Sequence, residues 1–127
     1  MTDLADLQTA VETAWDARDA LRPGDEHAAI AAAVETVLQQ LDAGTLRVAE
    51  KADGAWITHQ WLKKAVLLSF RLNDNVMIDN GPGAGHWWDK VPSKFAGWDE
   101  AAFRAAGFRA VPGSFARAGS HIAKNVI

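Results

Sequence analysis

Arg109 stands where the sequence would hold an arginine rigidly. It lies in residues 107–112 (GFRAVP), between the expected end of a helix at Gly107 and the stiff ring of Pro112. A guanidinium group binds a carboxylate through two parallel hydrogen bonds, so a rigid Arg109 would suit a dicarboxylate substrate. A surface salt bridge explains the same residue equally well, and both interpretations stay open at this point.

Other charged or nucleophilic candidates are weaker. Lys90 and Lys94 would add positive potential near Arg109, but we favour the interpretation that both are solvated surface lysines. The chain has no Gly-x-Ser-x-Gly motif, so its serines do not support a hydrolase. With no cysteine, and with histidines that are not spaced as ligands, we expect no metal site. The histidines are His27, His59, His86 and His121.

Residues 81–88 contain features of two kinds of functional site, a phosphate-binding loop and a catalytic histidine. The glycines at positions 81, 83 and 85 resemble a phosphate-binding loop, but such a loop needs a helix directly after it, and a Trp-Trp pair follows instead. We therefore expect a mobile connection. His86 beside Trp87 and Trp88 could act as a base, but a histidine packed on aromatic rings is the better interpretation. The six tryptophans are expected first of all in the core or at an interface.

Apolar periodicity predicts the helices that must position these residues. Apolar residues three and four apart predict one helix over 4–15 and a second over 30–41. Asp25 is a candidate N-cap of the second helix, and Gly44 is placed to end it. Residues 60–72 are apolar on most sides, which predicts a central buried helix.

Extended segments and turns connect these helices. Residues 46–50 alternate with period two, Asp53-Gly54 is a turn pair, and residues 55–58 are again extended, so a β-hairpin is expected near 46–58. A short strand is expected at 76–78. Asp99 and Gly107 bracket a further short helix.

Composition limits the possible functions. The chain has 127 residues and 13.7 kDa, enough for one domain. Thirteen basic against sixteen acidic residues give a net charge of −3, which opposes nucleic-acid binding and anionic membranes. A winged-helix nucleic-acid binder built on the hairpin and Lys63-Lys64 is only a distant alternative. No secretion leader is evident, and residues 65–70 are too short to span a bilayer, so we expect a cytoplasmic protein.

The end of the sequence changes character. Ala116 and Ile122 are six residues apart in small, polar surroundings, and the sequence stops at Ile127 within an apolar, strand-like run. We therefore expect that the next element of the fold is missing.

Three stretches of the chain together form a specific pattern. They are residues 46–75 (LRVAEKADGAWITHQWLKKAVLLSFRLNDN), residues 90–113 (KVPSKFAGWDEAAFRAAGFRAVPG) and residues 122–125 (IAKN). The pattern resembles the amino-terminal region of tetrahydrodipicolinate N-succinyltransferases. The resemblance implies a helical domain before a left-handed parallel β-helix of hexapeptide repeats, in a homotrimer. Ala116 and Ile122 would be the first two inward aliphatic positions of that β-helix.

The same resemblance implies an activity and a role for one residue. The family transfers a succinyl group from succinyl-CoA, a co-substrate and not a cofactor, to tetrahydrodipicolinate in diaminopimelate and lysine biosynthesis. Arg109 matches the family arginine that binds the acceptor. The family's acidic active-site residue and coenzyme A groove match nothing here, so no catalytic and no cofactor-binding residue is expected. Gly113 departs from the family, whose members often have a second proline there.

We therefore predict an α+β fold, mainly helical. Residues 1–107 would form the helical domain with its hairpin, and residues 108–127 an extended segment that starts the β-helix. The predicted function is the amino-terminal part of an N-succinyltransferase, inactive as this chain alone. The alternative is a non-enzymatic helical binding or assembly module without the β-helix.

Overall fold

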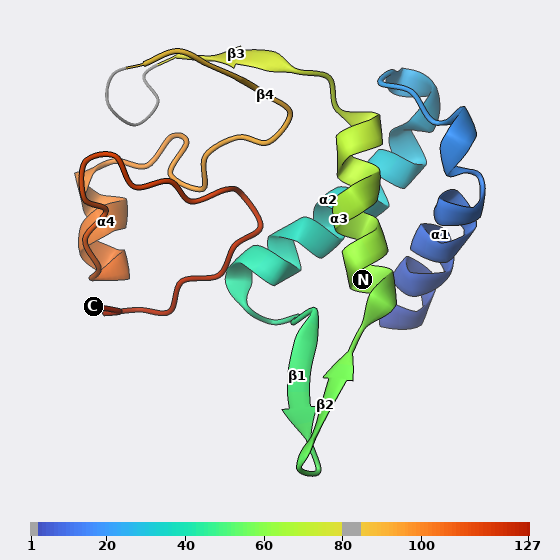
Figure 1. Cartoon of the computed structure of the whole chain (residues 1–127), viewed down its shortest axis with the longest axis horizontal. Coiled ribbons are helices and arrows are strands. Elements are labelled where there is room, and N and C mark those ends of the chain that lie inside the picture. Colours follow the sequence, from blue (N-terminus) through green and yellow to red (C-terminus); the bar gives the residue numbers. More distant parts are fainter. Residues whose placement is uncertain (1–2, 80–84) are drawn as a thin grey trace.

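Three helices form a bundle on which the rest of the chain is arranged. The computed structural model describes residues 3–79 and 85–127. Within them, α1 (Leu4–Asp16), α2 (Ala28–Ala43) and α3 (Gln60–Leu72) pack together, and α3 contacts both of the others. Figure 1 shows this bundle to one side and the later segments, with the C-terminus, to the other.

The core confirms the prediction that residues 60–72 form a central buried helix. Leu62 is 1% exposed, and Ala65 and Leu68 are fully buried. The small Ala65 side chain lets α3 approach its neighbours closely. The buried apolar side chains are Leu7, Val11, Ala14, Leu21, Val34, Val37, Leu41, Trp61, Leu62, Ala65 and Leu68.

The start of α2 differs from the prediction and its end agrees with it. Residues Asp25–His27 form a 3₁₀ turn, so the α-helix begins only at Ala28 with His27 at the N-cap position. The prediction of Asp25 as N-cap was therefore wrong. Gly44 ends the helix in the left-handed conformation, at φ +77°, as expected for a glycine at this place.

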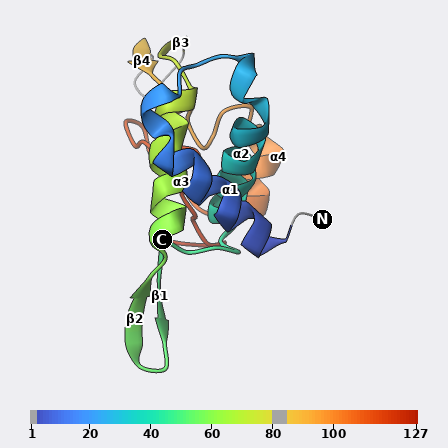
Figure 2. The ribbon, with the colours of Figure 1, turned by 90° about the vertical axis from the view of Figure 1, so that its right-hand side faces the viewer.

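The predicted hairpin is present. Strands β1 (Ala49–Ala52) and β2 (Ala55–Thr58) pair antiparallel, and Figures 1 and 2 show them projecting from the bundle as a two-stranded ribbon. Asp53 and Gly54 both have positive φ, at 49° and 81°, the conformation that a two-residue hairpin turn needs. The first strand begins later than predicted because Leu46 and Val48 pack against the core instead.

A second two-stranded sheet follows α3. The predicted strand β3 (Val76–Ile78) pairs antiparallel with β4 (Trp87–Asp89), and Met77 lies opposite Trp88. The sequence did not predict β4. Of the glycines proposed to form a mobile connection, those at 81 and 83 lie outside the described residues.

The last part of the chain holds one short helix and then extended segments. In α4 (Glu100–Ala106), the Asp99 carboxylate accepts a hydrogen bond from the Ala102 N–H at 2.9 Å, and Gly107 ends the helix at φ +72°. Both predicted ends are confirmed. Residues 108–127, all of which the structure describes, form neither a helix nor a named strand. The start of a β-helix there stays a prediction.

The chain is thus a small, mainly helical domain with two small antiparallel sheets. Among the described residues, no helix has the length and apolar character needed to cross a membrane.

Replacing Leu68 with Ala should lower the free energy of unfolding by about 2–5 kcal/mol, because it leaves a cavity where α3 meets its neighbours. Leu67→Ala is the matched control, since Leu67 is next in sequence but 41% exposed, and it should cost about 1 kcal/mol or less. Urea denaturation followed by circular dichroism measures both. Equal losses would contradict the central position of α3.

Candidate functional site

Arg109 lies in an open pocket at the far side of the molecule from the bundle. The pocket has a volume of about 660 Å³, and residues 107–111 and 114–116, Phe95, Ile122, Val126 and Ile127 line it. Arg109 itself is exposed. Among the described side chains, no carboxylate lies within 4.0 Å of its guanidinium. Arg109 therefore lines the pocket without an ion-pair partner among those residues.

Four aromatic rings support the backbone on which Arg109 stands. Phe95, Trp98, Phe103 and Phe108 form one cluster, with ring centroids 5.1–6.1 Å apart. Phe108 directly precedes Arg109, so its packing fixes the backbone at the start of the Arg109 segment.

The end of the chain closes over the same segment. The Asn125 N–H donates to the Ala106 carbonyl oxygen at 3.0 Å, and a side chain at Gly107 would meet the Asn125 Oδ1 at 2.0 Å. Glycine at position 107 thus serves both the left-handed helix end and this close approach. The contact holds the last residues beside the Arg109 pocket.

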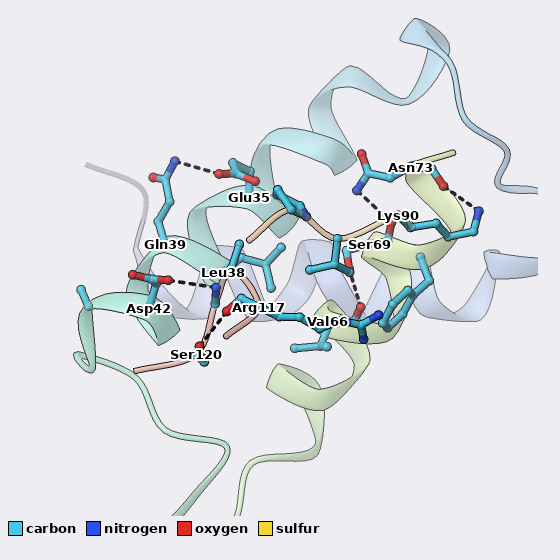
Figure 3. A pocket seen from close by; sticks show the side chains of 16 residues that line it. Glu35, Leu38, Gln39, Asp42, Val66, Ser69, Asn73, Lys90, Arg117 and Ser120 are labelled. Carbon is cyan, nitrogen blue, oxygen red and sulfur yellow. Dashed lines mark hydrogen bonds between the residues drawn. The ribbon is translucent and has the colours of Figure 1, made fainter. Parts of the chain in front are cut away.

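Asp42, near the end of α2, ties the extended segment to the bundle. One carboxylate oxygen accepts from the Lys94 Nζ at 2.6 Å and the other from the Gly119 N–H at 2.9 Å, as Figure 3 shows for the latter. The Asp42 carbonyl oxygen is 3.0 Å from the His121 Nδ1. The His121 ring lies over Gly44, where no side chain would fit. We call this set of contacts the Asp42 junction.

Lys94 is not the solvated surface lysine that the sequence indicated, whereas Lys90 is only half-buried and makes an exposed hydrogen bond. The Lys94 side chain is only 6% exposed and its charge is neutralised by Asp42. The Lys90 ammonium donates to the Asn73 carbonyl oxygen at 2.8 Å. The prediction was wrong for Lys94 because its partner Asp42 lies 52 residues away, on α2, which local patterning cannot place next to this lysine.

A second ion pair joins β4 to the extended segment. The Arg117 Nη2 donates to the Asp89 Oδ2 at 2.5 Å. The backbone N–H of Lys90, and then Arg117, hold the pKa of the Asp89 carboxyl below its ordinary value. Because folding lowers this pKa, the ionised Asp89 stabilises the folded state at pH values above the ordinary pKa of an aspartate. This stabilisation is lost as the pH falls through the lowered value.

The histidines are dispersed over the molecule. His59 is 2.7 Å from the Glu50 carboxylate, and His86 is exposed and 2.8 Å from that of Asp79. His27 lies beside Glu26, and His121 belongs to the Asp42 junction. The described residues contain no cluster of three or more His, Cys, Asp or Glu side chains able to hold a metal ion.

Residues 6–72, from α1 to the end of α3, match the family model described as tetrahydrodipicolinate N-succinyltransferase N-terminal. The chain belongs to this family. The match covers the helical bundle and the β1–β2 hairpin, and it ends before Arg109.

Curated members of the succinyltransferase family extend the similarity beyond the bundle. The chain is 57% identical over 127 residues to the 2,3,4,5-tetrahydropyridine-2,6-dicarboxylate N-succinyltransferase of Caulobacter vibrioides, covering 98% of this chain and 46% of that protein. The proteins of the same name from Rhodospirillum rubrum and Agrobacterium fabrum are 57% and 56% identical, covering 95% and 100% of this chain and 42% and 45% of theirs. The chain thus spans less than half the length of these relatives.

Replacing Asp42 with Asn should lower the free energy of unfolding by about 2 kcal/mol, because the buried Lys94 ammonium loses its counter-charge. The double variant Asp42→Asn with Lys94→Met should recover part of this loss, since it removes the unpaired charge. Glu35→Gln is the control, an exposed carboxylate of the same helix. Urea denaturation measures all three, and a loss for Asp42→Asn no larger than for Glu35→Gln would contradict the Asp42 junction.

Replacing Gly44 with Ala should displace His121. Gly97 is the matched control, because its φ of +76° is within one degree of that of Gly44 but a side chain there would meet nothing within 4 Å. Both variants share the strain of a left-handed alanine, and Gly44→Ala should cost about 1 kcal/mol more. Unfolding measurements, together with the NMR shift of the His121 ring, test this expectation. An unmoved His121 resonance with equal losses would disprove it.

Proposed function

We propose that this chain forms the amino-terminal part of an enzyme that transfers a succinyl group from succinyl-CoA to tetrahydrodipicolinate, in diaminopimelate and lysine biosynthesis. The supporting observation is the 56–57% identity over nearly the whole chain to proteins named for this acyl transfer. Arg109 would bind a carboxylate of the acceptor.

The geometry of Arg109 supports this assignment. The relatives are named for a 2,6-dicarboxylate, and a guanidinium fork is the side chain best matched to such a group. Arg109 lines an open pocket and stands on a backbone fixed by the aromatic cluster and by Asn125. A site already oriented before the substrate arrives loses less entropy on binding.

The chemistry requires groups beyond this chain. In the proposed step, water adds across the C=N bond of the tetrahydropyridine, so that the acceptor nitrogen carries a proton. This nitrogen then attacks the thioester carbonyl carbon, a C–N bond forms, the C–S bond breaks, and coenzyme A leaves as a thiol. A base must take the proton from the nitrogen, and hydrogen-bond donors must stabilise the oxyanion. A guanidinium group donates hydrogen bonds and has no acceptor, so the role of Arg109 would be to bind and orient the acceptor and not to take up a proton.

Residues 108–127 would enter the hexapeptide β-helix of a cytoplasmic homotrimer. Ala116 and Ile122 are both half-buried and both line the Arg109 pocket, which suits inward positions of a first coil. In this arrangement the β-helix would supply the base and the coenzyme A groove.

In the full-length enzyme, Arg109→Ala should lower kcat/KM for the acceptor by about two orders of magnitude, because the substrate carboxylate loses a charge-assisted contact. Arg109→Lys should recover only part of the loss, since it restores charge but not the two-pronged geometry. Coenzyme A release at varied acceptor concentration measures both variants.

Arg104→Ala is the matched control for this experiment. Arg104 lies on α4, five residues earlier, and its exposed side chain pairs with Glu100 outside the pocket. Its replacement should leave kcat/KM unchanged. The 127-residue chain alone should release no coenzyme A above background. An unchanged kcat/KM in Arg109→Ala would remove Arg109 from the site, and robust turnover by the chain alone would refute the proposed division of the enzyme.

A further inference from the structure

A second pocket, distinct from that of Arg109, lies against the helical bundle. Figure 3 shows it between the second half of α2 and the second half of α3. Residues 90–92 and 117–120 form the remaining walls. Its volume is about 610 Å³, within the range of pockets that hold a small molecule, so an aromatic side chain fits inside it.

The interior of this pocket is apolar. Leu38, Val66 and Phe70 line it, and the only buried polar side chain there among the described residues is Ser69. The Ser69 hydroxyl already donates to the Val66 carbonyl oxygen at 2.6 Å. An apolar ring would therefore enter without leaving a buried polar group unpaired.

One carboxylate at the rim of the pocket has no cationic partner. Glu35 is exposed, lies one helical turn before Leu38 on α2, and accepts a hydrogen bond from the neutral Gln39 amide at 3.0 Å (Figure 3). Among the described side chains, no cation is within 4.0 Å of it, whereas Asp42 is paired with Lys94. A cation that accompanies an apolar group to Leu38 would thus lie beside Glu35.

The β1–β2 hairpin carries the complementary groups. Trp56 is 73% exposed, the most exposed of the six tryptophans, and every residue of β2 is exposed. Lys51 lies directly opposite Trp56 in the register, so the two side chains stand on the same face of the ribbon with their Cβ atoms about 5 Å apart. Among the described side chains, no carboxylate is within 4.0 Å of the Lys51 ammonium.

The hairpin does not bring these groups to the pocket of its own chain. Figures 1 and 2 show the ribbon projecting away from the bundle, and none of its residues lines the pocket. A two-stranded ribbon without cover is only marginally stable in water, so a surface packed on Trp56 would stabilise it. The two complementary surfaces of one chain can therefore meet only between two copies.

We propose that the hairpin of one copy of this chain docks into the pocket of a second copy. Trp56 would pack on the apolar side chains that line the pocket, and Lys51 would pair with Glu35 at its rim. Opposite charges placed beside the apolar contact fix the register in which the two surfaces meet. Because the two surfaces differ, the contact is heterologous, with one copy giving the tryptophan and the other the pocket.

Sedimentation velocity of the purified chain at rising concentration tests the proposal. A contact of this small size should give a Kd of about 10–100 µM. Trp56→Ala should weaken association at least about tenfold, because a buried tryptophan dominates a small interface. Trp88→Ala is the matched control, since Trp88 is 65% exposed on β4, and it should leave the Kd unchanged. A chain that stays monomeric up to about 1 mM, or equal losses for the two variants, would overturn the proposal.

A charge exchange tests the register of the contact. Lys51→Glu and Glu35→Lys should each weaken association about two- to fivefold, the range for an exposed ion pair. The chain with both substitutions should associate as the unmodified chain does, because the pair is restored with its signs reversed. A double variant no stronger than the weaker single variant would overturn the proposed contact.

Mixing two variants tests the direction of docking. Ala118→Trp would fill the pocket from its own wall and leave the hairpin intact, while Trp56→Ala leaves the pocket intact. Neither should associate with itself, and the mixture should form a complex of one copy of each. Ser120→Trp, at an exposed lining position, replaces Ala118→Trp if circular dichroism shows that the latter is unfolded. No complex from two folded variants would overturn the proposal. None of these readouts depends on catalysis, so the proposed function stands or falls separately.

Discussion

The Asp42 junction is the contact on which the arrangement of the two halves depends. The bundle of α1, α2 and α3 closes its core with its own residues. The extended segment around residues 116–121 has no comparable apolar core and is held through polar groups, by the Asp42 carboxylate and by backbone hydrogen bonds of residues 92–94. Because one carboxylate accepts from both Lys94 and Gly119, its loss would release two segments at once.

The segment held by this junction contributes residues to two pockets. Ala116 lines the Arg109 pocket, and residues 117–120 line a second pocket, which lies between α2 and α3. A single short segment is therefore a wall of both. Its position is fixed at Gly119 by Asp42 and at Arg117 by the ion pair with Asp89 and the backbone bridge to Ser93.

The sequence pattern predicted those features of the fold that depend on interactions between residues close together in the chain. The periodicity of α1 and α3, the Asp53-Gly54 turn and the two ends of α4 depend on residues within a few positions of each other, and the structure agrees with them. The strand β4 forms by pairing with β3, so the local sequence around Trp87 and Trp88 did not predict it. Lys94 looked solvated because nothing in its own segment indicates Asp42. The Arg109 backbone was predicted to be rigid from Pro112, whereas the structure adds two supports, the aromatic cluster and Asn125.

The surroundings of Arg109 explain why its proposed role needs a second surface. Val111, Phe115 and Val126 are about half exposed around the pocket, so water reaches the guanidinium. A carboxylate bound there would gain little, since solvent screens exposed ion pairs. In the proposed enzyme, a surface packed on this apolar rim would exclude water from the pocket. The same two charges would then attract each other more strongly, because the effective dielectric constant around them falls. An exposed arginine within an apolar rim is thus the expected form of a substrate site of which this chain provides one side.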